Sequence, residues 1–158
     1  MIPDNAGLII EIDKPSDIYN KLENNPIWQR LLEVQDIENF NGEISWIDSL
    51  ISNKTDYSKL FWNSPLIFTF YSDSITNAEI LILSKIESHV DLSKLKSLLS
   101  IELGREYAIL DIVGVSDGFK IVSVSKNATR YFTFVDGVFA YSSSADLFKK
   151  LYDTYSGK

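Results

Sequence analysis

The chain contains no cysteine and a single histidine, His89. Without cysteine it cannot form a disulfide-stapled scaffold, a thiolate metal site or a cysteine nucleophile. With one histidine it cannot supply two imidazoles to one site. Its 158 residues are the length of one ordinary domain, and a chain of this length buries a core without such staples. We therefore expect residues 1–158 to form a single domain.

Long hydrophobic runs are also missing. No uninterrupted apolar stretch exceeds four residues, as in Ile80–Leu83, whereas a membrane-spanning helix needs about 20. We therefore expect no transmembrane segment in this sequence. The first residues lack the basic and apolar stretches of a signal peptide, because Met1 is followed at once by Pro3 and Asp4. That start fits a cytosolic protein, and equally a piece whose leader has been removed.

Basic charge is scarce in the first third of the chain. The formal net charge is −7. Residues 1–57 hold 11 acidic and 4 basic side chains, whereas residues 58–158 hold 11 of each. Binding of nucleic acids and of anionic membrane surfaces rests on basic side chains. We therefore expect no nucleic-acid partner, and we interpret the acidic excess as a solvated helical face.

The sequence motifs of familiar enzymes are absent. There is no Gly-x-Ser-x-Gly elbow and no dinucleotide or phosphate-binding glycine loop. The nearest match to a calcium loop, Ile37–Asp48, has Ile37 where the first carboxylate ligand is required. Arg130–Val135 faintly resembles an RNA-recognition strand, but bulky residues replace its small ones. We interpret it as an aromatic sheet face packed under a helix, and we expect no metal, no cofactor and no enzymatic activity.

Four residues remain as candidates for a binding site. Glu11 and Asp13 share one face of the first predicted strand, and Asp111 lies inside an apolar strand. Paired carboxylates support glycoside hydrolysis; the alternative is a solvated sheet face or a partner for a nearby lysine. Trp46 falls outside the apolar stripe of the helix predicted around it, so it is a candidate anchor for a protein partner. Its alternative role is the second wall of a core packed from two sides.

The pattern of apolar residues predicts alternating strands and helices. Three early strands are predicted at Leu8–Ile12, Leu66–Tyr71 and Glu79–Ser84. Between the first two, apolar residues recur at helical spacing, most clearly over Ile37–Ile51, and predict helices. A further helix is predicted over Asp91–Leu103, with Gly104 where it ends.

Two Asp-Gly pairs, Asp117-Gly118 and Asp136-Gly137, lie between β-rich runs in the last third. This dipeptide is a strong hairpin signal because both central residues of a type I′ turn need positive φ. It predicts two hairpins, with strands at Ala108–Val115, Phe119–Ser125, Tyr131–Val135 and Val138–Tyr141. The second hairpin would pair Phe134 with Phe139 and Phe132 with Tyr141 on one face.

A closing helix follows the second hairpin, with an N-cap supplied by Ser142–Ser144. Antiparallel strands dominate and helices arrive in clusters, which is typical of the α+β class. We therefore predict an antiparallel sheet with a C-terminal four-stranded meander and helices packed mainly on one face.

Several segments together resemble the repeating unit of large, uncharacterised, membrane-anchored envelope proteins of Bacteroidetes, a domain of unknown function. The segments are Ile2–Ile12, Asn25–Trp28, Ile47–Ile51, Ser64–Phe68 and Asp136–Ser144. The resemblance implies an extracytoplasmic location, in the periplasm or cell envelope, and an anchor upstream in a longer protein. No such anchor is present in this sequence, and the resemblance brings no catalytic residues.

Taken together, these features predict a non-enzymatic interaction or scaffold domain of a bacterial cell-envelope protein. Its partner would be another protein or the remainder of the same polypeptide, bound through the acidic helical layer around Trp46 or through an unpaired sheet edge. The alternative is a carbohydrate-type ligand-binding protein, or a hydrolase, with an unfamiliar carboxylate site.

Overall fold

The computed structural model describes residues 8–13, 24, 26, 29, 42–43, 45–46, 64–72, 78–86, 90–125 and 128–156. Most of the helices predicted in the first third, and His89, lie outside these residues. Gly42 and Glu43 are helical, as are Ser45 and Trp46.

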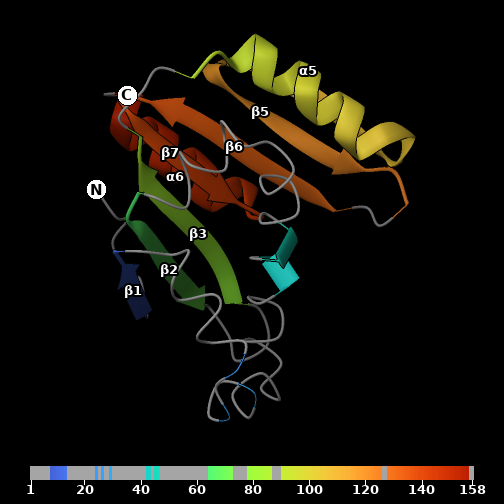
Figure 1. Cartoon of the computed structure of the whole chain (residues 1–158). Coiled ribbons are helices and arrows are strands. Elements are labelled where there is room, and N and C mark those ends of the chain that lie inside the picture. The colour runs from blue at the N-terminus through green and yellow to red at the C-terminus, as the bar shows by residue number, and fades with distance from the viewer. Residues whose placement is uncertain are drawn as a thin grey trace.

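Seven strands form one antiparallel sheet (Figure 1). They are β1 (Leu8–Ile12), β2 (Leu66–Ser72), β3 (Ala78–Lys85), β4 (Tyr107–Ile112), β5 (Val115–Ser123), β6 (Thr129–Val135) and β7 (Val138–Ser142). Their order across the sheet is β1-β2-β3-β7-β6-β5-β4. The last four strands are neighbours in chain order, so the predicted C-terminal meander and the α+β class are confirmed.

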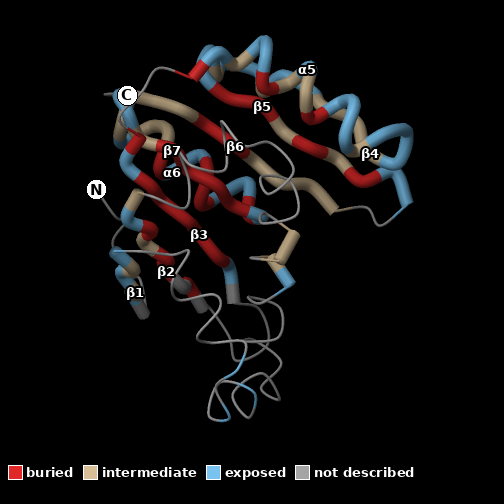
Figure 2. Tube along the Cα trace, viewed as in Figure 1, coloured by how far each residue is buried: buried red, intermediate tan, exposed pale blue. Residues whose placement is uncertain are grey.

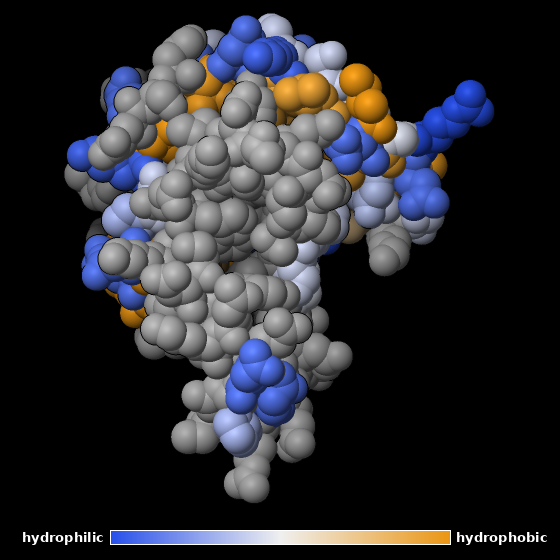
Figure 3. All heavy atoms as spheres, viewed as in Figure 1, coloured by the Kyte–Doolittle hydropathy of each residue, from blue (hydrophilic) through white to orange (hydrophobic). Residues whose placement is uncertain are grey.

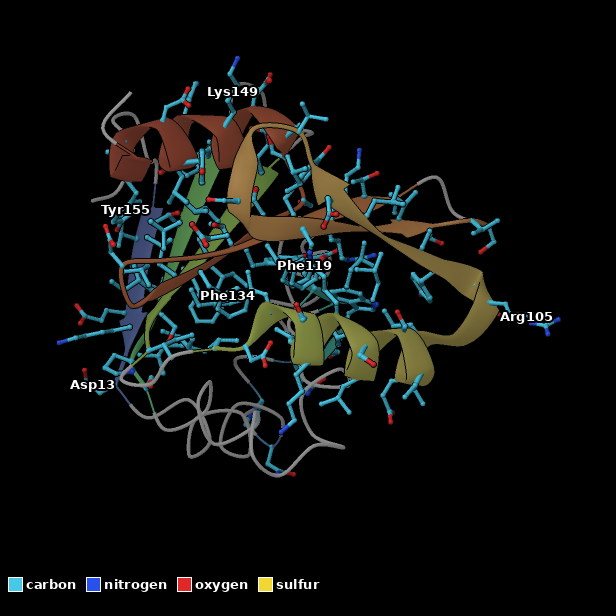
Figure 4. All side chains as sticks on the ribbon, turned by 90° about the horizontal axis from the view of Figure 1, so that it is seen from above. Asp13, Arg105, Phe119, Phe134, Lys149 and Tyr155 are labelled. Carbon is cyan, nitrogen blue, oxygen red and sulfur yellow. The ribbon has the colours of Figure 1, made fainter. Side chains whose placement is uncertain are left out.

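Among the described residues, two twelve-residue helices cover the sheet from opposite sides. Helix α5 (Leu92–Leu103) and helix α6 (Ala145–Ser156) flank the sheet in the view from above (Figure 4). The sequence predicted helices mainly on one face. Residues of the central strands are buried along most of their length (Figure 2). Their apolar side chains form one core on each face of the sheet, and α6 covers the second face.

The larger core lies on the α5 face. It joins Leu95 and Leu99 of α5 to aromatic and aliphatic residues of the sheet, among them Ile80, Ile82, Phe119, Ile121, Phe132, Phe139 and Tyr141. The smaller core lies on the α6 face and contains Leu81, Leu83, Ala140, Leu147 and Leu151. Alternate residues of β3 thus feed the two cores, as the period of two along a strand requires.

Helix α5 ends at the predicted Gly104, and α6 begins after the predicted serine cap. Asp91 caps α5 by accepting a hydrogen bond from the backbone N–H of Lys94 at 3.1 Å, and Gly104 ends the helix with φ of 62°. A short 3₁₀ turn, Gly104–Glu106, then leads into β4. Ser144 caps α6, because its Oγ accepts from the backbone N–H of Leu147 at 3.3 Å.

The second predicted hairpin is confirmed in detail. Asp136 and Gly137 have φ of 51° and 74°, as a type I′ turn requires. Phe134 pairs with Phe139 and Phe132 pairs with Tyr141. The rings of the two pairs lie 5.3 and 5.2 Å apart, on the face of the larger core.

The first predicted hairpin turns at a different place, so this prediction is wrong. The turn is formed by Val113 and Gly114, with φ of 80° at Gly114, whereas Asp117 and Gly118 lie inside β5. Position 118 requires glycine because the backbone of β6 lies very close to its Cα. A Cβ at this position would lie 2.7 Å from the backbone oxygen of Phe132. Gly118, which the sequence predicted in a turn, instead allows β5 and β6 to pack closely together.

Candidate functional site

The predicted carboxylates do not converge. Glu11 is on β1 and Asp111 is on β4, the two edge strands of the sheet. Six strand spacings of about 4.8 Å separate these edges by roughly 29 Å. Glu11 and Asp13 are both exposed. Asp111 is 84% exposed, and its Oδ1 accepts a hydrogen bond from Nζ of Lys96 at 2.5 Å. The structure therefore does not unite Glu11 and Asp111 in one hydrolytic site.

Trp46 packs against the sheet within its own chain. It is half-buried and contacts the larger core. Its ring lies 6.1 Å from that of Phe132 and 6.4 Å from that of Tyr141, and the guanidinium of Arg130 sits 4.1 Å from the ring centroid. A cation over an indole face at this distance is a favourable cation–π contact. These contacts favour the role of Trp46 as a second wall of the core.

The same residues surround an ion pair. Arg130 donates from Nε and Nη2 to the two carboxylate oxygens of Glu43, each at 3.0 Å. Tyr141 donates from its hydroxyl to Oε2 of Glu43. The Arg130 and Glu43 side chains are 15% and 20% exposed, respectively. We call Glu43, Trp46, Arg130 and Tyr141 the Glu43 cluster.

The surroundings of the Glu43 cluster shift the pKa values of Tyr141 and Arg130. Burial, and then the negative charge of Glu43, raise the pKa of Tyr141, so its phenol stays neutral and donates. Burial opposes the charge of Arg130, but the hydrogen bonds and charge of Glu43 outweigh it and the pKa of Arg130 is raised. Arg130 therefore stays charged and Tyr141 stays a neutral donor, and through Glu43 both groups tie the helical residues 42–43 and 45–46 to the sheet.

Sequence reasoning missed Glu43 and undervalued Arg130. The two residues are 87 positions apart, so no local spacing relates them. One signal was available: Arg130 shares its sheet face with Phe132 and Phe134, because side chains alternate along a strand. A charged residue in an apolar row predicts a buried partner of opposite charge.

A cavity of about 700 Å³ lies between the start of α5 and the turn that joins β6 to β7. Its lining combines apolar and acidic side chains: Ile86, Val90, Leu92, Phe134, Val138, Asp91, Asp117 and Asp136. Phe134 lies on the sheet face that looks toward α5 (Figure 4). Within the described part of the chain, no three acidic or histidine side chains are placed to hold a metal ion.

Beyond α6, one part of the sheet has no helical cover among the described residues. Helix α6 packs mainly on β3, β6 and β7. On the same face, Leu110 of β4 pairs with Lys120 of β5, and Ala108 pairs with Val122. We call these four residues the open sheet surface. Leu110 is 45% exposed, so apolar side chains meet solvent here.

Exposed apolar side chains gather around β4. Five large ones are exposed in the described part of the chain: Ile9, Ile101, Leu110, Val113 and Val124. Apart from Ile9, they are Ile101 near the end of α5, Leu110 in β4, Val113 in the turn to β5 and Val124 just after β5. Apolar side chains also reach the surface along the α5 side of the molecule (Figure 3). Clustered exposed apolar groups mark interaction surfaces more than single ones do.

None of the helices in the described ranges has the length and apolar character needed to cross a membrane. Searches of known protein families, curated proteins and solved structures found no significant match to this chain.

Proposed function

We propose that this chain is a non-enzymatic interaction or scaffold domain of a bacterial cell-envelope protein. The observation that carries the proposal is the concentration of exposed apolar side chains around β4, a strand at the edge of the sheet. An edge strand with apolar neighbours is a ready template for another polypeptide. The partner is another protein or a further part of the same polypeptide.

The use of charged groups also supports an interaction role. Arg130 and Glu43, which are largely buried, are committed to each other and to Tyr141. Asp111 is paired with Lys96 at the surface. These arrangements stabilise the fold, and they leave no reactive pair among them. The extracytoplasmic location rests on the sequence resemblance, and the net charge of −7 disfavours a nucleic-acid partner.

Site-specific photocrosslinking tests this proposal. A photoreactive amino acid is placed at Leu110 or Val122 of the open sheet surface, in the bacterium that encodes the chain. Lys149, exposed on α6, provides the matched control position. We expect a discrete protein adduct in the envelope fraction from Leu110 and Val122, suppressed by excess unlabelled chain, and little from Lys149. Equal yields at all three positions, or no adduct at all, would contradict the proposal.

The cavity beside α5 favours a second candidate function, the binding of a small carbohydrate-type ligand. Phe134 offers an aromatic face, and Asp117 and Asp136 offer acceptors for sugar hydroxyls. Titration with neutral oligosaccharides, followed by amide NMR shifts, tests it. Shifts confined to the cavity residues and lost in Phe134→Ala would support a ligand site. Unchanged spectra throughout the titration would eliminate it.

A further inference from the structure

Strand β4 presents a defined row of backbone groups at the sheet edge. In an antiparallel pair, successive residues direct their N–H and C=O alternately toward and away from the neighbouring strand. The N–H of Val124 donates to the carbonyl of Glu106 at 2.9 Å, so Glu106 faces β5. By alternation Ala108 and Leu110 also face β5, and the backbone groups of Tyr107, Ile109 and Asp111 point away from the sheet.

The side chains of β4 offer little protection against pairing. Natural edge strands are commonly blocked by proline, lysine or an inward-pointing charge. β4 has the sequence Tyr-Ala-Ile-Leu-Asp-Ile, which contains neither proline nor lysine. Its one charge, Asp111, lies next to the register shift at the end of the strand. The first four residues form an uncharged edge.

We propose that β4 pairs antiparallel with β4 of a second copy of this chain, across a two-fold axis at Ala108. This inference rests on the proposed interaction function and names its partner. Outward-facing residues must pair with outward-facing residues, and an axis at Ala108 sets Tyr107 opposite the partner's Ile109. Ala108 then meets its own copy, where a small side chain suits the close approach of a non-hydrogen-bonded pair.

Charge complementarity selects this register. With the axis at Ala108, the 3₁₀ turn that carries Arg105 lies beside the partner's Asp111, within reach of the long Arg105 side chain, and symmetry forms this pair twice. Arg105 projects from the molecule just before β4 (Figure 4). Lys96 contacts Oδ1 of Asp111, and the carboxylate has a second oxygen for another cation. An axis at Ile109 or Leu110 would set Asp111 opposite Tyr107 or Ile109 instead, with no cation.

The surroundings of the edge suit a second copy of the chain. The acidic excess lies in residues 1–57, whereas residues 58–158, which contain β4, hold equal numbers of acidic and basic side chains. Pairing also places the exposed Leu110 of each copy diagonally across from the partner's Ala108, on the same face of the extended sheet. Because an edge-to-edge contact buries little area, we expect a reversible dimer with a dissociation constant in the micromolar range.

Sedimentation velocity over micromolar to millimolar concentrations of the purified chain tests the proposal. Arg105→Asp places two aspartates opposite each other, and Asp111→Arg places two arginines opposite each other. We expect each variant to dimerise about tenfold more weakly or worse, since two surface ion pairs become two repulsions. Lys149→Glu, far from β4 on α6, is the control and should dimerise as the wild type does.

Mixing the two variants makes the test specific. Arg105→Asp and Asp111→Arg each repel themselves, but together they restore opposite charges at both ends of the interface. We expect the equimolar mixture to form heterodimers. Circular dichroism checks that both variants remain folded. A wild type that is monomeric throughout, or a mixture that stays monomeric, overturns the proposal. If adducts to a different protein still form at Leu110, the inferred partner is wrong while the interaction function stands.

Discussion

Replacing Arg130 by methionine removes the cation that balances Glu43 inside the Glu43 cluster. Exposed ion pairs contribute about 0.2–1 kcal/mol, whereas removing one member of a buried pair costs about 3–5 kcal/mol. The two side chains are 15% and 20% exposed, which places them nearer the buried limit. We therefore expect Arg130→Met to lower the free energy of unfolding by about 3 kcal/mol.

The partner variant, Glu43→Gln, leaves a guanidinium with a neutral acceptor and keeps an oxygen for the hydroxyl of Tyr141. We expect it to cost about 2 kcal/mol. In the double variant no unpaired charge remains, and the Tyr141 hydroxyl still has an acceptor. Its cost should be about 3 kcal/mol rather than the sum of the two single costs, which corresponds to a coupling of about 2 kcal/mol.

Urea unfolding at neutral pH, analysed by linear extrapolation, measures all four corners of this cycle. The slopes with urea should be equal, because none of the substitutions changes the surface exposed on unfolding very much. Costs that add within about 0.5 kcal/mol would refute the reasoning, since independent sites behave in that way. Such additivity would mean that Glu43 and Arg130 interact mainly with water and not with each other.

Two further predictions concern Tyr141 and two glycines, Gly118 in β5 and Gly114 in the turn before it. Burial and then Glu43 raise the pKa of Tyr141 above its ordinary 10.0, so stability is full below pH 10 and falls above it, by about 1.4 kcal/mol per pH unit for this group. Tyr141→Phe should remove that one-proton slope in urea melts up to about pH 11; an unchanged slope would contradict the assignment. Gly118→Ala should cost about 3 kcal/mol, because its Cβ would meet backbone. Gly114→Ala meets no atom within 4 Å and should cost about 1 kcal/mol from its positive φ alone, so the reverse order in thermal melts would show that Gly118 forms the turn.

Local signals predicted most of the fold. The strands from Leu8–Ile12 onward, the end of α5 at Gly104, the N-cap of α6 at Ser144 and the hairpin at Asp136-Gly137 depend on residues close in sequence, and the structure bears them out. Asp117-Gly118 carries the same dipeptide and forms no turn. Glycine is needed at position 118 because the backbone of Phe132, on a neighbouring strand, lies close to it. The residues next to Gly118 in the sequence give no sign of this long-range contact.

The candidate site was harder to predict from the sequence, because its residues meet through contacts between distant parts of the chain. Trp46 was identified, but its partners Arg130 and Tyr141 come from strands far along the chain. Glu11 and Asp111 were considered together because of their chemical type, and strand order then placed them at opposite edges. Residue type predicts which side chains can react, whereas only topology determines which of them meet.

The position of β7 in the sheet affects how the polypeptide folds while it is being synthesised on the ribosome. Residues 138–142 fill the gap between β3 and β6, although they are made more than fifty residues after β3. Until they emerge, β3 has an unpaired side, and the two halves of the sheet cannot join. Co-translational folding of the first strands is therefore incomplete, and a chaperone that shields β3 during this interval would raise the yield of native protein.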